Sequence, residues 1–236
     1  MVKFDLLVIG EINPDLILWD QDVVPAFGQV EKLMEDATLT IGSSSVIMAC
    51  GAARLGLRTA FVGVVGDDLF GRFMLEAMAE RGIDTSACVV HPSLATGLSV
   101  ILAQPGDRAI LTHMGAIPTL TLEQIDSSLL RRTGHLHCGS YFLLRHLQPG
   151  LGQLFADAQA AGASTSLDTN WDPSGRWDSG LDKVWPHCDL FLPNAAEARK
   201  IAGSDELPQA LDWLAQRVPT LAVKLGAAGG LARSGE

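Results

Sequence analysis

Several features that define common protein classes are absent from this sequence of 236 residues. No C-x-x-C pair occurs, so we expect reduced, buried thiols and no zinc site; the four cysteines are Cys50, Cys88, Cys138 and Cys188. No G-x-G-x-x-G run follows the first predicted strand, and no G-x-x-x-x-G-K-[ST] run occurs. These two absences argue against a dinucleotide-dependent oxidoreductase and against a P-loop kinase.

Basic residues are also scarce. The 17 lysines and arginines face 27 aspartates and glutamates, giving a formal charge of −10. This balance argues against a nucleic-acid partner and against an anionic membrane surface. The first apolar run contains Asp5 and is too short for a signal peptide or a membrane span, so we expect a cytoplasmic protein.

The remaining composition favours one main α/β domain. Hydrophobic residues make up 47% of the chain, which is enough for a sizeable core. Predicted strands and helices alternate, so the central sheet should be mostly parallel with helices on both faces. Residues 4–9, 135–139, 164–167 and 189–192 are predicted strands of this sheet, and residues 121 onward are predicted to begin a helix with Gln124 in capping-box position.

The most informative stretch is residues 41–71. Gly42 and three serines, Ser43 to Ser45, precede an apolar helix that ends at Gly56. The run TAFVGVV then predicts a buried strand, and a turn at Gly66 opens a second helix.

This stretch resembles the first signature of the ribokinase-like sugar kinases, the phosphofructokinase B family. The resemblance is carried by Gly42, by Leu55-Gly56 at the helix end, and by a V-G-x-D-x-x-G pattern whose positions are Gly63, Gly66, Asp68 and Gly71. Two positions differ: Ser43 stands at the second glycine, and Ile47 stands at an asparagine that commonly contacts the sugar. The resemblance continues to Gly230 and implies a three-layer α/β sandwich with a small β-sheet lid.

The resemblance implies that the lid comes from residues of about 11–40 and 96–115, inserted in one incomplete ribokinase-like domain of residues 1–236. In the first segment G-E-I-N-P-D matches the family's G-x-x-x-x-D, so Asn13 and Asp15 are expected to bind the sugar. A carboxylate accepts hydrogen bonds from two adjacent hydroxyls, although Asp beside Pro14 is also typical of a turn. Residues 97–104 and 108–113 predict a hairpin, and Arg108, just after its turn, either reaches a ligand carboxylate or phosphate or stays solvated.

Further site residues follow later strands. Asp168 and Asn170 end one strand, where open α/β sheets bind ligands, and the family has D-x-N near its substrate there. Turn chemistry explains the same two residues equally well. The predicted substrate-binding set is Asn13, Asp15, Gly42, Ser43, Ser44, Arg108, Asp168 and Asn170.

The nucleotide side is predicted from two motifs. Asn194 and Glu197 form a helix capping pattern, and the family has N-x-x-E near the phosphates and a magnesium ion at this place. Glu197 is therefore the expected metal-site residue, through water. Lys224 with Gly226 and Gly229 matches the family's strand and glycine turn beside the nucleotide. The His135-x-His137 pair could also hold a metal, but a polar strand end explains it better.

The implied reaction is ATP- and Mg²⁺-dependent phosphorylation of a sugar hydroxymethyl group, with a homodimer through the lid as an expected assembly. The family's D-T-x-G-A-G-D run, whose last Asp is the catalytic base, does not occur in the 236 residues. We therefore expect the base beyond residue 236 and no turnover by this chain alone. The alternative is a non-catalytic sugar-binding protein or pseudokinase.

Overall fold

The structure, a computed structural model, describes residues 3–178 and 180–234. Its body is an eight-stranded sheet in the order β14-β13-β12-β11-β10-β1-β4-β6, parallel throughout except for the β13–β14 pair. The strands are β1 (Phe4–Ile9), β4 (Thr59–Val62), β6 (Ile83–Asp84), β10 (Thr133–Cys138), β11 (Ser164–Leu167), β12 (Leu190–Phe191), β13 (Thr220–Lys224) and β14 (Gly230–Ser234).

Alternating side chains of β1 reach both faces of this sheet. Leu6 and Val8 pack with the helices α1 (Ser44–Arg54) and α2 (Leu69–Glu80), whereas Leu7 and Ile9 join a larger core on the opposite face. That larger core includes side chains of α3 (Gln148–Ala160), α4 (Ala195–Ala202) and α5 (Leu207–Ala215). Helices therefore cover both faces, as expected for a parallel sheet.

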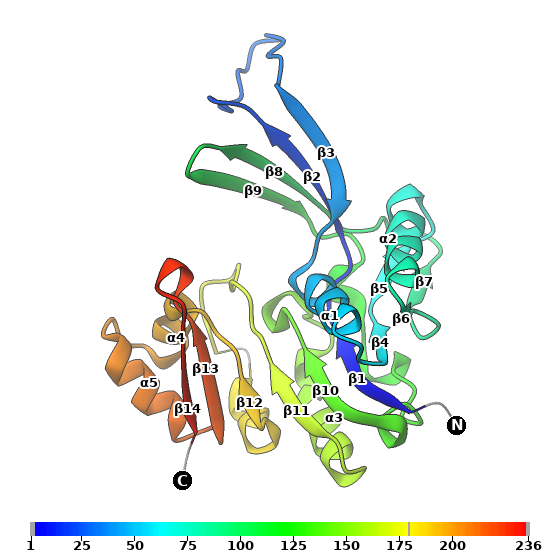
Figure 1. Cartoon of the computed structure of the whole chain (residues 1–236), viewed down its shortest axis with the longest axis vertical. Coiled ribbons are helices and arrows are strands. Elements are labelled where there is room, and N and C mark those ends of the chain that lie inside the picture. The colour runs from blue at the N-terminus through cyan, green and yellow to red at the C-terminus, as the bar shows by residue number, and fades with distance from the viewer. Residues whose placement is uncertain (1–2, 179, 235–236) are drawn as a thin grey trace.

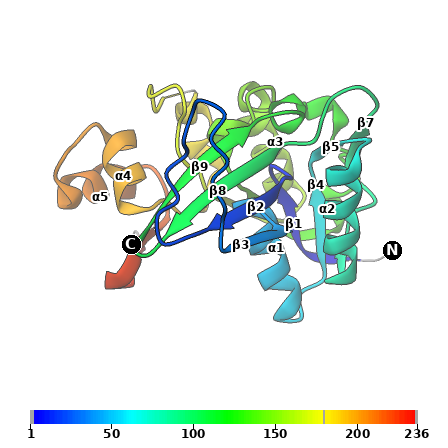
Figure 2. The same ribbon diagram turned by 90° about the horizontal axis from the view of Figure 1, so that it is seen from above.

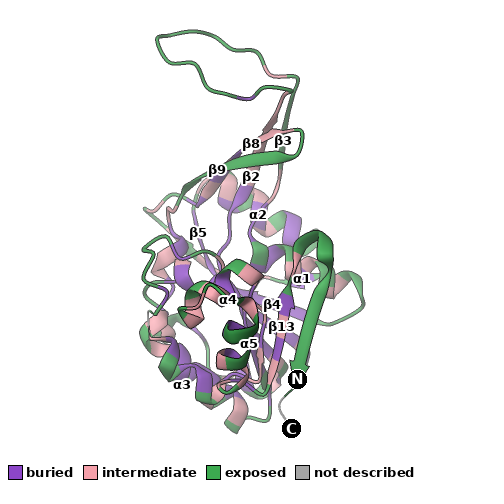
Figure 3. Cartoon of the chain, turned by 90° about the vertical axis from the view of Figure 1, so that its left-hand side faces the viewer, coloured by how far each residue is buried: buried purple, intermediate pink, exposed green. Residues whose placement is uncertain are grey.

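A second sheet projects from one end of the body (Figure 1). Its order is β3-β2-β8-β9, and we call these four strands the lid sheet. The strands are β2 (Pro14–Trp19), β3 (Asp36–Ile41), β8 (Leu98–Gln104) and β9 (Asp107–His113). They come from the two segments expected to form a lid, and Figure 2 shows them crossing above the body. Every residue of β9 is exposed, so this edge strand lies in solvent (Figure 3).

Two local predictions were wrong. The run TAFVGVV forms two strands, because the chain leaves the central sheet at Gly63 and continues as β5 (Val64–Gly66), which pairs with β7 (Val89–His91). A side chain at Gly63 would approach the Gly10 carbonyl oxygen to 2.6 Å, so this crossing requires glycine.

The helix predicted from Thr121 is only one 3₁₀ turn, Leu122–Gln124. Its capping box is present, but Ile125 is extended and buried, and Asp126 then accepts a hydrogen bond from the Ser128 amide. The burial of Ile125 and the turn at Asp126 therefore end the helix after one turn, although the capping box of Thr121 and Gln124 favours a longer one.

Candidate functional site

The predicted substrate residues gather where the lid sheet faces the carboxyl ends of the central strands. A cavity of about 740 Å³ lies there. Six of the predicted residues line it: Asn13, Asp15, Ser43, Ser44, Arg108 and Asn170. The lid sheet also contributes Ile17, Ser99, Ile101, Ile110 and Thr112, and the body contributes Glu11, Ile47, Leu143, Arg145 and Trp171. The cavity is therefore lined by apolar side chains and by several polar side chains that point into the same space, as is typical of ligand-binding sites.

Asp15 is held at the cavity by its neighbours. Asn13 Nδ2 donates hydrogen bonds to Asp15 Oδ1 at 3.3 Å and to Ser99 Oγ at 3.3 Å. Burial raises the pKa of Asp15, whereas the charge of Arg108 lowers it. Gly42 does not line the cavity, but a side chain there would approach Asp15 Oδ1 to 2.1 Å. Gly42 thus leaves room for the Asp15 carboxylate.

The serine turn before α1 is anchored by Glu11. This side chain is 2% exposed and accepts hydrogen bonds from Ser45 Oγ at 2.5 Å and Ser44 Oγ at 3.2 Å. Ser43 caps α1 by accepting from the Val46 amide at 3.0 Å, and its hydroxyl donates to the Glu11 carbonyl at 2.7 Å. Glu11 was missed as a site residue, although its place just after the first predicted strand, residues 4–9, is the same signal that pointed to Asp168.

Three residues in this region have positive φ angles that side chains rarely adopt. These are Ser43 at 66°, Ser140 at 53° and Asn170 at 56°. Hydrogen bonds join two of them to the serine turn: Asn170 Nδ2 donates to Ser140 Oγ at 3.1 Å, and Ser44 Oγ lies 2.9 Å from Ser140 Oγ. Unfavourable backbone conformations of this kind are typical of functional sites.

The predicted nucleotide residues form a second group at the ends of the neighbouring strands β12 and β13. Asn194 and Glu197 make a reciprocal capping box, in which Glu197 Oε2 accepts from the Asn194 amide at 2.8 Å and Oε1 from Asn194 Nδ2 at 2.7 Å. Asn194 also forms a parallel bridge with Lys224. After Lys224 the chain turns at Gly226 and Gly229, whose φ angles are 60° and 86°.

Asp168 connects the two groups and does not line the cavity. Its Oδ1 accepts a hydrogen bond from the Asn170 amide at 3.0 Å, and its Oδ2 forms an ion pair with Lys224 Nζ. The turn contact expected for Asp168 is therefore present, whereas its role in substrate binding stays a prediction.

Among the described residues no group of three or more His, Cys, Asp or Glu side chains is arranged to hold a metal ion. Both oxygens of Glu197 accept hydrogen bonds from Asn194, so this carboxylate fits a magnesium ion only through intervening water. The His135 and His137 rings instead contact serines: His135 reaches Ser164 and Ser166, and His137 Nδ1 lies 2.8 Å from Ser166 Oγ.

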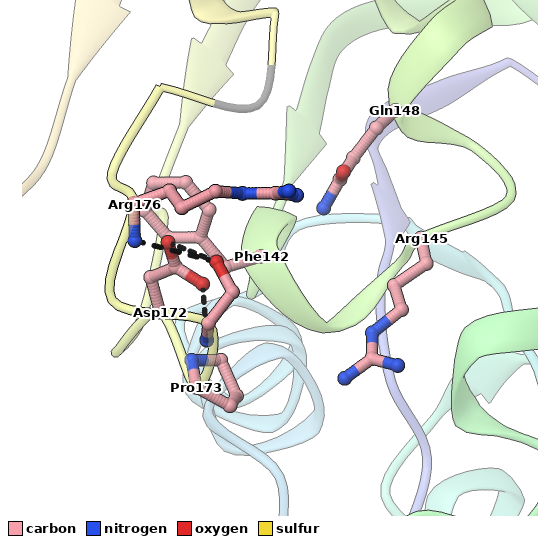
Figure 4. A pocket seen from close by; sticks show the side chains of 7 residues that line it. Phe142, Arg145, Gln148, Asp172, Pro173 and Arg176 are labelled. Carbon is pink, nitrogen blue, oxygen red and sulfur yellow. Dashed lines mark hydrogen bonds between the residues drawn. The ribbon is translucent and has the colours of Figure 1, made fainter.

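A smaller cavity of about 390 Å³ lies beside the larger one (Figure 4). Its lining is Phe142, Arg145, Gln148, Asp172, Pro173, Ser174 and Arg176, so it shares Arg145 and Pro173 with the larger cavity. The Asp172 carboxylate is occupied by hydrogen bonds from Ser174 and from the Trp177 amide. Sequence reasoning missed Arg145, because it lies in an irregular segment after β10.

Comparison with known proteins defines the class. The family model described as pfkB family carbohydrate kinase matches residues 3–236. This chain therefore belongs to the pfkB family of carbohydrate kinases.

Individual relatives agree with this assignment. An uncharacterized sugar kinase of Archaeoglobus fulgidus is 26% identical over 188 residues, covering 79% of this chain and 74% of the relative. Fructokinase-1 of Zea mays is 26% identical over 196 residues, with 79% and 61% covered. The 5-dehydro-2-deoxygluconokinase of Geobacillus kaustophilus is 36% identical over 135 residues, with 54% and 38% covered. The chain thus spans less than two thirds of two of these three relatives.

Solved structures show the same fold. The Arabidopsis thaliana ribokinase complexed with ribose and ATP superposes with a TM-score of 0.79 at 21% identity, covering 99% of this chain and 75% of that one. The Xylella fastidiosa fructokinase with bound ATP gives a TM-score of 0.77 at 22% identity, with 98% and 75% covered. The expected ribokinase-like fold, with a mostly parallel central sheet and a small second sheet, is confirmed.

Proposed function

We propose that this chain binds a sugar or sugar-like substrate in the 740 Å³ cavity and serves its ATP- and Mg²⁺-dependent phosphorylation at a hydroxymethyl group. The observation that carries the proposal is the convergence of Asn13, Asp15 and Asn170 on one cavity at the carboxyl ends of the strands. Carboxylate and amide groups suit hydroxyl pairs, and the apolar wall suits the C–H faces of a sugar.

The nucleotide is assigned to the neighbouring group. Lys224 would neutralise phosphate charge, and the turn at Gly226 and Gly229 would let the nucleotide approach the backbone. The N-terminus of α4 at Asn194 and Glu197 would lie near the phosphates, with a magnesium ion held through water. A bound Mg²⁺ would supply charge neutralisation at the transferring phosphoryl group.

Substrate names of the relatives narrow the acceptor to carbohydrates. Two of them are a fructokinase and a 5-dehydro-2-deoxygluconokinase, so both neutral sugars and gluconate derivatives are candidate acceptors for this chain.

We also propose the cytoplasm as its location. Among the residues the structure describes, no helix has the length and apolar character to cross a membrane.

A second candidate is sugar binding without catalysis, which the cavity and its polar side chains support equally. Titration of the chain with a panel of sugars in a calorimeter tests the binding step that both candidates share. Because the catalytic base is expected beyond residue 236, a phosphoryl-transfer assay separates the two functions only on a form extended beyond that residue, with the 236-residue chain as its comparison. ATP-dependent product from the extended form supports the kinase, and sugar binding without product in both forms supports the sugar-binding protein. Asp15→Asn should weaken binding about tenfold, and unchanged affinity would remove Asp15 from the site. Asp20→Asn, a half-buried change beyond the end of β2 and outside the cavity, is the matched control.

The lid sheet is also the proposed dimer interface. Its edge strand β9 exposes Ile110 by 51% and Leu111 by 59%, and an exposed apolar edge strand favours pairing. Light scattering after gel filtration should then give a mass near twice 25.1 kDa. Leu111→Lys should reduce it to the mass of one chain.

A further inference from the structure

Two guanidinium groups line the substrate cavity from opposite sides. Arg108 lies on β9 of the lid sheet, and Arg145 follows the 3₁₀ turn Tyr141–Leu143 of the body. Within the described part of the chain, neither side chain forms a hydrogen bond or an ion pair. Figure 4 shows the Arg145 guanidinium pointing away from Gln148, with no dashed line to another drawn residue.

Two acidic side chains, Glu11 and Asp15, line the cavity, and neither forms an ion pair with Arg108 or Arg145. Glu11 is occupied by Ser44 and Ser45, and both of its oxygens accept hydrogen bonds. Asp15 interacts with Arg108 through charge alone, since the two are not joined by an ion pair within 4.0 Å. Arg145 contacts neither carboxylate. Both arginines are exposed, so their guanidinium groups are free to meet a ligand in the cavity, and an anionic ligand would give them a partner that a neutral one cannot.

We infer that the acceptor is a sugar acid, whose carboxylate is bound between Arg108 and Arg145. A guanidinium presents several planar N–H donors, which match a carboxylate better than an ammonium group does. The sugar hydroxyls would then contact Asn13, Asp15 and Asn170. This inference rests on the proposed sugar site and names the chemical class of its ligand.

The apolar lining fits such a ligand. Ile47 is 54% exposed and Trp171 is 53% exposed, and both line the cavity. Ile47 stands where the family resemblance predicts an asparagine that contacts the sugar. A deoxygenated carbon or a C–H face packs against Ile47 without leaving a hydroxyl unpaired. The cavity thus has an apolar contact at Ile47 and a cationic one at Arg145.

The test compares matched ligands that differ only at the charged group. Calorimetry on the full 236-residue chain uses D-gluconate against D-glucitol, and D-galactonate against D-galactitol, at constant ionic strength. Each acid and its polyol share the same hydroxyl pattern, but the polyol has a CH₂OH group in place of the carboxylate. At least one acid should bind at least tenfold more tightly than its polyol.

The arginine variants then locate the carboxylate. Arg108→Gln and Arg145→Gln should each weaken acid binding by about tenfold or more and change polyol binding less than threefold. Arg54→Gln, at the exposed end of α1 outside the cavity, removes the same charge and should change neither. Circular dichroism melting confirms that the variants fold.

The outcomes separate this inference from the proposed function. Neutral sugars that bind as tightly as every acid would overturn the sugar-acid inference and leave the sugar site intact. Equal losses for acid and polyol in the arginine variants would overturn it as well. Tighter binding of fructose 6-phosphate than of any acid would assign the arginines to a phosphate. Absence of binding by acids, polyols and neutral sugars alike would overturn both proposals.

Discussion

Lys224 Nζ on β13 forms an ion pair with Asp168 Oδ2 at the end of β11. The two strands are not neighbours, because β12 lies between them. The pair therefore crosses a strand at the carboxyl edge of the sheet. The ion pair connects the residues proposed to bind the nucleotide with Asn170. The backbone amide of Asn170 donates to Asp168 Oδ1, and Asn170 lines the cavity.

This relationship predicts separate effects on stability and on binding. Lys224→Gln should lower the free energy of unfolding by at most about 1 kcal/mol, since the Lys224 side chain is 54% exposed and exposed ion pairs contribute little. The same change should weaken ATP binding about tenfold, because it removes a charge from the proposed phosphate site. Denaturant unfolding and titration with a fluorescent ATP analogue measure the two effects. Lys200→Gln, an exposed change on α4, is the control, and equal ATP affinity in both variants would exclude Lys224 from the site.

Glu197 should act in the metal dependence of nucleotide binding as well as in the cap. Burial raises the pKa of Glu197, while its hydrogen bond from the Asn194 amide acts in the opposite direction. Glu197→Gln keeps part of the cap, so we expect a loss of about 1 kcal/mol in the free energy of unfolding. It also removes the negative charge, so the increase in ATP affinity produced by Mg²⁺ should shrink. If titrations with and without Mg²⁺ give the wild-type ratio, Glu197 serves the cap alone.

Ser43 should favour glycine over alanine, the opposite of their ranking inside a helix. Its φ of 66° and ψ of 123° favour glycine, which is also the residue that the family pattern has there. Both substitutions remove the hydroxyl contacts to Val46 and Glu11, but only Ser43→Gly relieves the backbone strain. Ser43→Ala should therefore be about 1–2 kcal/mol less stable than Ser43→Gly. Ala52→Gly compares the same two residues inside α1, where glycine should lower the free energy of unfolding by about 1 kcal/mol. If the Ser43→Ala variant is as stable as Ser43→Gly, the positive φ at position 43 does not strain the backbone.

His137 should make the fold sensitive to mild acid. Burial lowers the pKa of His137 to about 4 from its usual value near 6.5. The unfolded chain therefore takes up a proton at a higher pH than the folded chain. The stabilisation from a neutral His137 is complete above pH 6.5 and is lost as the pH falls toward 4. The loss is of the order of 3 kcal/mol.

Denaturant unfolding between pH 7 and pH 4 measures this loss. His137→Asn keeps a polar group beside Ser166 but does not titrate, so its stability should fall less over the same range. His146→Asn, a histidine on the short segment before α3, is the control for a general histidine effect. Parallel pH profiles for wild type and His137→Asn would show that the ring is not the titrating group.

Local sequence signals predicted much of the fold. The start of α1 at the serine turn, the end near Gly56, the capping box of α4 and the hairpin of β8 and β9 all follow from short-range chemistry. Each depends on residues within a few positions of one another. The same reasoning failed at Thr121, where burial of Ile125 overrode a valid cap.

The amino-acid sequence by itself determined the family, the alternation of strands and helices, and the strand ends where polar side chains gather. Only the tertiary structure decided which of those side chains meet. The cavity combines residues from the segment after β1, the lid sheet, the start of α1 and the segments after β10 and β11, so no single motif contains it. Arg145 joins Arg108 across this cavity, and Gly42 leaves space for Asp15, because distant segments pack at one edge of the sheet. Contacts between segments far apart in the chain depend on strand order and lid position, which local propensity does not encode.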